Sequence, residues 1–532
     1  MTGAATGTLW DALLATHGPV LPVVLPLAAG ALLTLLESAR SAALRTWAPR
    51  VSMAATLALA VLALLLLGRA SGGTVQAYLV GNWPAPFGIA LALDRLGALM
   101  VLLAALVACG ALVYALGGEA ARGRHFHALF QFQLMGLNGA FLTADLFNLF
   151  VFFEVLLAAS YGLLLHGRGA GQRQRLQAAV HYVTFNLAGS SLFLIALGLL
   201  YGVAGTLNMA DLAVKLSSLP RDDMRLAQAG ALLLLTVFAV KAALLPLYFW
   251  LPDTYAAASA PVGALFAIMT KVGVYAVLRV TTLIFGAELA GPFLSTLALA
   301  TLALAAVGAL AATRLRGLVA YLVVASAGTL LLAAGLGTEG TLAAGLLYLV
   351  NSTLAAAVWF LLADRIAAAR GGSDLLQPRP LGGRWAALGS AFFIAAVAVA
   401  GVPPLAGFMG KALLLQAAGT TALGPWVVAG VLASSLAVMV ALARAGSTLF
   451  WKSEHGGVPA ADTSPAHAAA VAALLGAVLT VAAAAGPISA YAGATAGQLL
   501  QRHGYIDAVM AAQPVPAAWD VRREMRERGN AK

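Results

Sequence analysis

The sequence predicts an all-α, polytopic membrane protein with about 14 transmembrane helices. Of its 532 residues, 61% are hydrophobic and only 10% are charged, whereas soluble globular proteins average about 45–50% apolar and about 25% charged residues. So few charged residues cannot cover the surface of a soluble protein, which excludes that class. The one cysteine, Cys109, excludes an internal disulfide. No cluster of Cys and His has the spacing of a metal or haem site, so we expect no metal and no cofactor.

Fourteen segments of the sequence are apolar over the roughly 20 residues that a helix needs to cross a bilayer. In chain order they cover residues 18–37, 50–68, 96–116, 126–143, 146–166, 177–203, 228–251, 260–285, 293–312, 317–337, 342–363, 385–418, 425–449 and 466–491. Because the connections are short, we expect no sizeable soluble domain. The prediction is a membrane domain over residues 1–491, followed by a polar C-terminal tail over residues 492–532.

The basic residues indicate the orientation of these spans. With the N-terminus outside, the inward loops hold 16 Arg and Lys residues and the outward loops hold 5, which follows the excess of basic residues in cytoplasmic loops. The same distribution accounts for the net charge of +11 without nucleic-acid binding. One feature disagrees, because fourteen spans put the tail outside although it carries Arg522, Arg523, Arg526, Arg528 and Lys532.

Three of the six lysines, Lys241, Lys271 and Lys411, fall inside apolar segments, whereas nearly all arginines lie in loops or in the tail. An ionised group at the bilayer centre costs about 2.5–3.5 kcal/mol on insertion scales, so these lysines are expected to serve a function. Arginine keeps its proton under physiological conditions, but a desolvated lysine can release it. The pattern therefore favours a proton path. The structural alternative is that the lysines extend to the span ends or join helices.

One acidic residue, Glu154, lies in the apolar run FNLFVFFEVLLAASYGLL. A buried carboxylate stays ionised only beside a cation, and Lys241 is the best candidate partner; a purely structural salt bridge is the alternative. Two further residues are candidate relays. His181 can relay a proton or form an ordinary hydrogen bond, and Asp253 can line a channel mouth or cap a helix. For the span residue Arg279, an acidic partner and a water-filled cavity both stay open.

Two spans contain prolines that should break the helix. Pro246 interrupts VKAALLPLYFWLPD, and Pro403 and Pro404 interrupt AVAGVPPLAGFMGKALLL. Proline removes one backbone hydrogen bond and clashes with the preceding turn, which lipid tolerates only where protein or water satisfies the freed groups. Each break has a buried lysine nearby. If residues 126–285 and 293–449 form two five-helix units, the broken spans seven and twelve are fourth in each, which is typical of inverted-repeat transporters.

These residues resemble a known family. The runs LFVFFEV, VKAALLPLYFWLPD, APVGALFAIMTKVGVYAVLR and GVPPLAGFMGK are similar to those of the antiporter-like subunits shared by respiratory complex I and Mrp-type cation/proton antiporters. Further runs, such as GNWPAPFGIALALDRLGALM and LLYLVNSTLAAAVWFLLAD, are most similar to the D subunits of Mrp (Pha) antiporters. The resemblance covers residues of about 80 to 420. It implies fourteen helices with two inverted five-helix repeats.

The resemblance also implies roles for the buried charges. Glu154 and Lys241 would form a coupled pair, Lys271 would relay protons at the centre, and Lys411 would serve the far half-channel. The chain departs from its complex I relatives where they tend to carry a histidine, because the aligned residue here is Ser326. Where many relatives hold a lysine or histidine in span eleven, only Asn351, Ser352 and Thr353 are available. A central relay must then run through hydroxyls, an amide and water.

The predicted function is a proton-translocating subunit of a multi-subunit Na⁺(K⁺)/H⁺ antiporter, and not an enzyme. Its expected partners are other subunits of the complex, the lipid bilayer, protons and Na⁺ or K⁺, in the cytoplasmic membrane of a bacterium. The first alternative is a proton-pumping subunit of an NADH–quinone oxidoreductase or a membrane-bound hydrogenase. The second alternative is a scaffold that transports nothing. No nucleotide-binding motif is present, so the driving energy must come from ion gradients or a partner.

Overall fold

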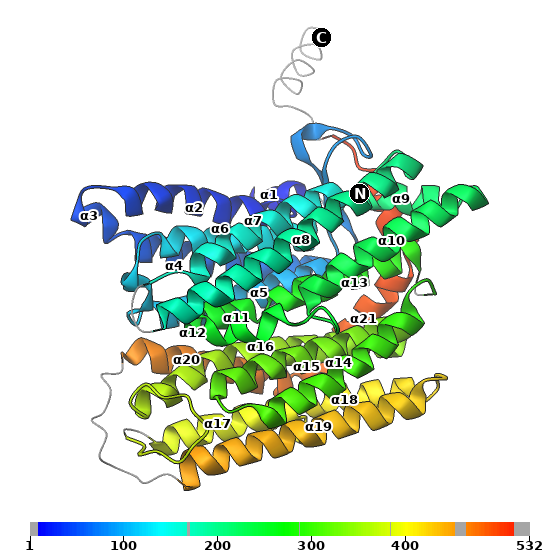
Figure 1. Cartoon of the computed structure of the whole chain (residues 1–532). Coiled ribbons are helices and arrows are strands. Elements are labelled where there is room, and N and C mark those ends of the chain that lie inside the picture. The colour runs from blue at the N-terminus through cyan, green and yellow to red at the C-terminus, as the bar shows by residue number, and fades with distance from the viewer. Residues whose placement is uncertain (1–8, 168–170, 287, 383–384, 453–463, 515–532) are drawn as a thin grey trace, which may run out of the picture.

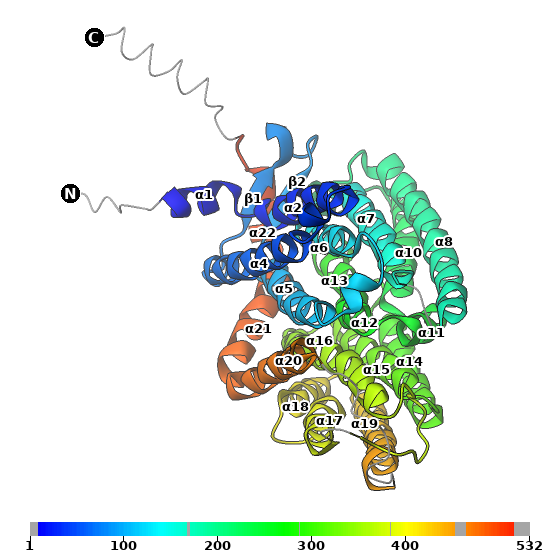
Figure 2. The ribbon, with the colours of Figure 1, turned by 90° about the vertical axis from the view of Figure 1, so that its left-hand side faces the viewer.

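The computed structural model describes residues 9–167, 171–286, 288–382, 385–452 and 464–514. Long helices lie side by side and run horizontally in Figure 1, and Figure 2 views the same helices along their axes. Most of the described chain is helical. This arrangement agrees with the predicted polytopic helical membrane protein.

Within the described residues, twelve stretches are long and apolar enough to cross a membrane. They correspond to α2 (Leu21–Ser38), α4 (Ala48–Ala70), α5 (Arg95–Ala115), α7 (Leu146–Leu164), α8 (Gln172–Ala204), α10 (Arg221–Ala242), α12 with α13 (Ala260–Phe266 and Met269–Val280), α14 (Gly291–Ala311), α15 (Leu315–Leu336), α16 (Glu339–Ala369), α19 (Gly424–Gly446) and α20 (Pro465–Ala483). Each lies at a position where the sequence predicts a span.

The remaining two predicted spans are shorter in the structure. Segment 126–143 forms α6 (Phe126–Leu142), a 17-residue helix with the buried polar residues Gln131, Gln133 and Asn138. Segment 385–418 is divided into α17 (Trp385–Ala400) and α18 (Ala406–Ala418). Neither half of the divided segment reaches the length of a full crossing. The count of fourteen spans therefore stays a prediction.

Short elements connect the long helices. They are α1 (Leu9–His17), α3 (Ala42–Arg45), α9 (Met209–Leu216), α11 (Trp250–Ala257), α21 (Ala485–Leu500), α22 (His503–Met510), the 3₁₀ turns η1 (Val80–Asn82) and η2 (Glu119–Arg122), and the π-helical turns η3 (Thr281–Phe285) and η4 (Ser447–Trp451). Strands β1 (Gln76–Leu79) and β2 (Ala90–Leu93) pair antiparallel, with Gln76 opposite Leu93. The sequence predicts only helices. The two strands could not be predicted, because four-residue strands are too short for a clear alternating pattern of apolar and polar residues.

Both proline-containing spans are interrupted, and each helix ends four residues before a proline. Helix α10 ends at Ala242, four residues before Pro246, and α17 ends at Ala400, four residues before Pro404. This spacing has a steric cause, because the proline ring clashes with the carbonyl of the residue four positions earlier. The chain leaves each helix through a left-handed residue, Ala243 with φ 57° and Gly401 with φ 76°. The second half of each span then continues as α11 or α18.

The two predicted repeat units occupy different parts of the molecule. Helices α6 to α13, from residues 126–285, form one group, and α14 to α19, from residues 293–449, form another below it in Figure 2. Helix α16 packs against α12, α15, α17 and α18, so it joins the two groups. The inverted relation between the units stays a prediction.

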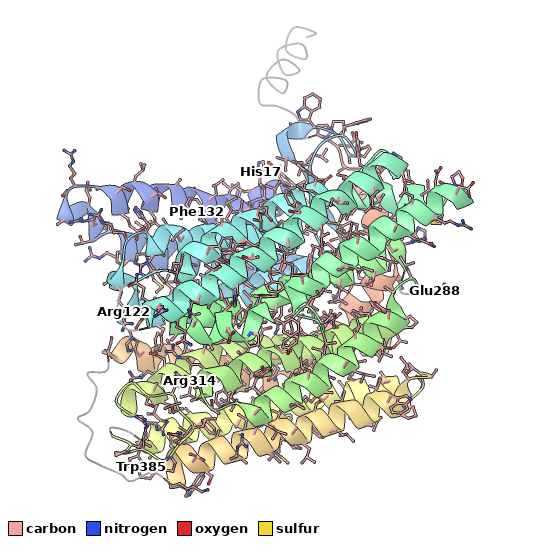
Figure 3. All side chains as sticks on the ribbon, viewed as in Figure 1. His17, Arg122, Phe132, Glu288, Arg314 and Trp385 are labelled. Atoms are coloured by element: carbon pink, nitrogen blue, oxygen red, sulfur yellow. The ribbon has the colours of Figure 1, made fainter. Side chains whose placement is uncertain are left out.

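The connections predicted to face the same side gather at the same end of the helices. Figure 3 places Arg122 and Arg314, from two predicted inward loops, and Trp385, at the inner end of the predicted span 385–418, at one end of the bundle. Glu288, from a predicted outward loop, lies at the other end. We call the first the basic end. The alternation of loops along the chain is therefore consistent with the spans.

The segment after residue 491 differs from the prediction of a polar tail. Helix α21 continues to Leu500, and Tyr505 and Val509 of α22 are buried against the helices. Packed helices thus continue beyond the predicted boundary at residue 491, because α22 has an apolar face that the average polarity of the segment conceals. Five basic residues of the predicted tail, Arg522, Arg523, Arg526, Arg528 and Lys532, lie outside the described residues.

The close contact between α17 and α18 gives a testable prediction. A Cβ atom at Gly407 would overlap the carbonyl oxygen of Ala398 and lie 2.9 Å from Nδ2 of Asn351. Overpacking of this kind costs about 1–3 kcal/mol, so Gly407→Ala should lower the melting temperature of the purified protein. The control is Gly198→Ala in α8, where the added Cβ meets no atom within 4 Å. Equal melting temperatures for the two variants would contradict this packing.

Candidate functional site

All three lysines predicted to be buried lie inside the helix bundle. Lys241 is in the last turn of α10, Lys271 is in α13, and Lys411 is in α18. Their exposed fractions are 5%, 0% and 9%. All three side chains are buried, which argues against the structural alternative that they extend to water. Each ammonium must therefore find its hydrogen-bond acceptors within the protein.

At the first break, helix α8 lies between the two residues expected to pair. The ammonium of Lys241 donates to Oδ1 of Asn186 at 2.9 Å and lies 5.8 Å from the ring centre of Phe153. The hydroxyl of Ser190 donates to the carboxylate of Glu154. Among the ion pairs within 4.0 Å in the described chain, none joins Glu154 to Lys241.

Asn186 and Ser190 were not predicted as site residues. They are four residues apart and therefore share one face of α8, and Tyr182, one turn earlier, faces the same way and shares a hydrogen bond with the hydroxyl of Ser160 at 2.9 Å. The sequence contains this signal, because polar residues at 182, 186 and 190 form a helical stripe in an apolar segment. Helix α8 thus contacts both Glu154 and Lys241 through neutral side chains.

At the centre, the ammonium of Lys271 donates to Oγ of Ser326 in α15 at 2.6 Å and lies 3.4 Å from Oγ1 of Thr270. Helix α13 is tightly packed on the end of α10, since a Cβ at Gly273 would lie 2.5 Å from the backbone nitrogen of Ala242. The turns that carry Lys241 and Lys271 are therefore in direct contact. Ser326, predicted as a relay, is the main hydrogen-bond partner of Lys271.

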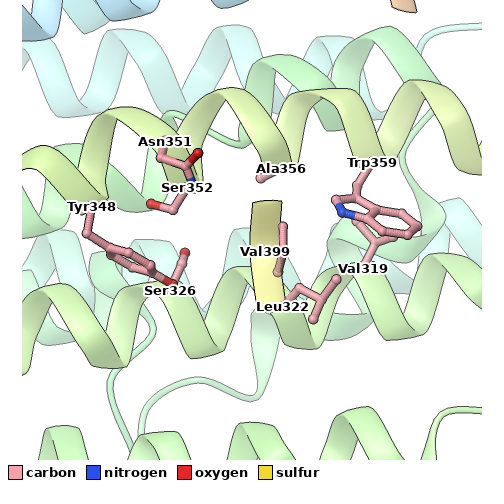
Figure 4. Close-up of a pocket in the computed structure, with 9 residues that line it drawn as sticks. All are labelled: Val319, Leu322, Ser326, Tyr348, Asn351, Ser352, Ala356, Trp359 and Val399. Atoms are coloured by element: carbon pink, nitrogen blue, oxygen red, sulfur yellow. The ribbon is translucent and has the colours of Figure 1, made fainter. Parts of the chain in front are cut away.

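A small cavity lies next to Ser326, between α15, α16 and α17 (Figure 4). The space open to the centre of a water molecule is about 10 Å³, which is room for about one water. Tyr348, Asn351 and Ser352 of α16 also line it. The Oδ1 atom of Asn351 is buried and has no hydrogen-bond partner among the described residues. A water molecule in the cavity would satisfy such an acceptor.

At the second break, the ammonium of Lys411 binds the end of α17. It donates to the carbonyl oxygens of Ala400 at 3.1 Å and Val399 at 3.4 Å, and to Oγ of Ser435 in α19 at 3.0 Å. Nδ2 of Asn351 donates to the preceding carbonyl, that of Ala398, at 3.1 Å. Carbonyls at a helix C-terminus carry partial negative charge and favour a cation. Asn351 therefore connects the cavity to the turn that binds Lys411.

Three of the candidate relay residues lie apart from this arrangement. His181 is exposed on the outer face of α8, and Asp253 is exposed in the first turn of α11. The hydroxyl of Thr353 donates to the carbonyl of Leu349 in its own helix and does not line the cavity. Of the predicted relay residues, only Ser326, Asn351 and Ser352 lie between Lys271 and Lys411 in the described chain.

Arg279, whose partner the sequence left open, forms a buried ion pair with Asp94. Its guanidinium lies 2.7 Å and 2.9 Å from the two carboxylate oxygens, and it also lies 4.8 Å from the ring centre of Tyr505 in α22. Asp94 additionally accepts from the backbone nitrogen of Gly97 and so caps α5. Within the described residues, no group of three or more His, Cys, Asp or Glu could hold a metal ion.

Comparisons with known proteins agree with this arrangement. A family model described as "NADH:quinone oxidoreductase/Mrp antiporter, TM" matches residues 143–437. A relative from Rhizobium meliloti (strain 1021), named as the D subunit of a probable K(+)/H(+) antiporter, is 41% identical over 93% of this chain and 98% of its own length. A relative from Bacillus subtilis (strain 168), named as the D subunit of an Na(+)/H(+) antiporter, is 39% identical over 71% of this chain and 77% of its own length.

A solved structure extends the comparison to the fold. A chain in the structure of the Mrp complex from Dietzia sp. DQ12-45-1b superposes with a TM-score of 0.82 at 26% sequence identity, covering 93% of this chain and 99% of that one. The matched family region contains all three buried lysines and both helix breaks.

The hydrogen bond between Asn186 and Lys241 gives a second prediction. Asn186→Leu keeps a similar volume but removes the only side-chain acceptor that the ammonium has in the described chain. Hydrogen bonds to charged groups are worth about 1.5–3 kcal/mol, so proton movement in membrane vesicles should fall by about tenfold or more. Ser191→Ala is the matched control, because Ser191 is exposed on the same helix and bonds only to its own backbone. A wild-type rate for Asn186→Leu would contradict a role for this contact.

Proposed function

Because this chain belongs to the family of NADH:quinone oxidoreductase and Mrp antiporter membrane subunits, we propose that it is the proton-translocating subunit of a multi-subunit Na⁺(K⁺)/H⁺ antiporter. Its relatives in Rhizobium meliloti and Bacillus subtilis are named as D subunits of such antiporters. The protein is thus a multi-pass membrane subunit of a larger assembly, and it acts as a transporter component rather than as an enzyme. The relatives' names include both K⁺ and Na⁺, so either cation fits the proposal.

The observation that carries the proposal is the set of ligands around the lysines. Lys241, Lys271 and Lys411 are buried, and their hydrogen bonds go to an amide, hydroxyls and backbone carbonyls. In the described chain none of them forms an ion pair within 4.0 Å. Neutral oxygen atoms accept hydrogen bonds from an ammonium, but unlike a carboxylate they do not hold the lysine in its protonated form. Each lysine can therefore take up and release a proton.

The proposed route begins at the first break. A proton that reaches Lys241 changes the electrostatic field at Glu154, with Asn186 and Ser190 of α8 between the two charges. The tight contact between α10 and α13 at Gly273 brings Lys271 under the same field, because Coulomb interactions are strong where water is excluded. The negative charge of the Glu154 carboxylate favours the protonated form of Lys241 at the first break.

The route continues from Lys271 to Lys411 through neutral groups. Ser326 accepts from Lys271 and lines the adjacent cavity together with Asn351, whose amide donates to the turn that holds Lys411. A water in that cavity would bridge Ser326 and Oδ1 of Asn351. A hydroxyl and a water can each donate one proton and accept another, but an amide and backbone carbonyls do not pass a proton on. Lys271 and Lys411 are therefore coupled by the polarity of this hydrogen-bonded layer, and each exchanges its own proton.

We further propose that the protein lies in the cytoplasmic membrane of a bacterium with its N-terminus outside. The named relatives come from bacteria, and the 16 basic residues of the predicted inward loops support this orientation. The basic end would then face the cytoplasm. A proton pump of an NADH–quinone oxidoreductase is the second candidate, because the family description covers both classes. The names of the relatives favour the antiporter.

Glu154→Gln tests the role of the negative charge. The amide keeps the shape of the carboxylate and can still accept from Ser190, so the complex should assemble. Without the charge, the field at Lys241 changes, and exchange of cations for protons in inverted vesicles should be nearly abolished. Assembly is checked by copurification with the other subunits. Full exchange activity in assembled Glu154→Gln complexes would count against the proposed coupling.

Lys411→Arg tests whether a proton is released at the second break. Arginine keeps a positive charge but does not release its proton at accessible pH, so Lys411→Arg should be nearly as inactive as Lys411→Ala. The measurement is the collapse of a pH gradient on adding Na⁺ or K⁺ to vesicles with matched amounts of complex. An active Lys411→Arg variant beside an inactive Lys411→Ala variant would leave Lys411 only an electrostatic role. Full activity of both would favour a scaffold.

A further inference from the structure

A row of polar side chains runs along helix α13 from the central lysine toward the outward end. Lys271, Tyr275 and Arg279 are spaced four residues apart, so they lie on one face of the helix. Arg279 is about 12 Å further along the axis than Lys271 at 1.5 Å per residue, in the direction of Glu288, which Figure 3 shows at the end opposite the basic end. Every residue from Met269 to Val280 is buried. A proton that left Lys271 outward along α13 would therefore have to pass along this row.

The hydroxyl of Tyr275 is held in an arrangement that cannot pass a proton outward. It donates to the backbone carbonyl of Phe141 at 2.7 Å, and its oxygen accepts from Nη2 and Nε of Arg279 at 3.3 Å and 3.4 Å. A backbone carbonyl does not pass a proton on, and a guanidinium has five N–H donors and no acceptor. The outward neighbour of the hydroxyl can therefore donate to it but cannot accept from it.

Two contacts hold the guanidinium of Arg279 in this position. Its Nη1 and Nη2 atoms lie 2.7 Å and 2.9 Å from the two carboxylate oxygens of Asp94, and its centre lies 4.8 Å from the ring centre of Tyr505 in α22. The side chains of the ion pair are 3% and 2% exposed, so the pair is closed to water. Because arginine keeps its proton at accessible pH, the guanidinium stays a donor without an acceptor.

We propose that Tyr275 and Arg279 close the outward side of Lys271, so that this lysine releases no proton to the outside. The inference rests on the proposed function, because it gives a direction to the proton exchange of Lys271. Arg279 is a positioning residue that acts through the hydroxyl of Tyr275, and Asp94 and Tyr505 hold it in place. The buried ion pair thus prevents a proton leak along α13 in addition to joining α13 to α5.

Two double variants separate this function from a purely structural one. Both carry Asp94→Asn, which keeps a good cap for α5 and avoids leaving a buried charge unpaired. The open variant adds Arg279→Ser, which leaves a polar space that water can fill. The closed variant adds Arg279→Met, which occupies most of that space with an apolar side chain. The ion pair is lost in both variants, so only a barrier to protons distinguishes them.

The measurement is the passive decay of an imposed pH gradient in vesicles that hold the assembled complex and a permeant anion, without Na⁺ or K⁺. We expect a decay about tenfold faster than wild type in the open variant, since a modest lowering of a barrier multiplies the rate, and an unchanged decay in the closed variant. Adding Lys271→Met to the open variant should restore the wild-type decay, because the leak then lacks its inner end.

Three results would overturn the proposal. They are a wild-type decay in the open variant, an equal leak in the open and closed variants, and a leak that persists with Lys271→Met. Assembly is checked by copurification with the other subunits. If the open variant assembles poorly, Arg279→His with Asp94 retained replaces it, because a neutral imidazole both accepts and donates a proton.

Two controls complete the experiment. Arg314→Gln with Asp374→Asn neutralises an ion pair at the basic end and should leave the decay unchanged; a leak there would show that loss of any ion pair suffices and would reject the barrier. Exchange on adding Na⁺ or K⁺ is measured on the same wild-type vesicles. If they exchange cations and the open variant does not leak, only this inference fails. If they exchange no cations, the proposed function fails, and the decay still decides whether the barrier exists.

Discussion

The second half of the molecule depends on hydrogen bonds donated to three backbone carbonyls at the end of α17. Pro403 and Pro404 lack the N–H groups that would bond this turn, and the surrounding lipid offers no donors. The protein supplies them from two neighbouring helices: Asn351 of α16 donates to Ala398, and Lys411 of α18 donates to Val399 and Ala400. The buried charge and the broken helix therefore stabilise each other, and neither would be tolerated in lipid without the other.

Helix α16 extends this interaction to the centre of the protein. The most apolar stretch of this helix is fully buried. Tyr348, Asn351 and Ser352 on one side of it line the cavity beside Ser326. A continuous series of contacts follows, from Lys271 through Ser326 and the cavity to Asn351 and the end of α17. At the first break the equivalent connection is made by packing, because Gly273 lets α13 touch the residue after Lys241. The two breaks are thus joined through Lys271, by packing on the side of the first break and by polar groups on the side of the second.

The features predicted from the sequence were those that conflict with a lipid environment. Lysines and prolines in apolar segments stand out in a single sequence, so the buried lysines and the interrupted helices could be predicted. The partners of Lys241 and Lys411 could not, because Asn186 and Ser435 are ordinary residues that lie 55 and 24 positions away in the chain. Ser326 was indicated only through the family resemblance. His181 shows the limit most clearly. It is only five residues from Asn186, yet helical geometry turns it to the outer face of α8.

The contrast between Arg279 and the lysines explains how one interior holds both kinds of cation. Arg279 keeps its charge permanently, and its guanidinium lies against the carboxylate of Asp94 with side-chain exposures of 3% and 2%. Such a pair is stable only while both charges persist, since removing one leaves the other buried and unpaired. A lysine paired in this way would be locked in its charged form. Lys271 and Lys411 instead bind hydroxyls, which accept from an ammonium and can donate to a neutral amine. The loss of a proton then leaves no unpaired carboxylate behind, and the hydroxyl remains hydrogen-bonded to the lysine in both states.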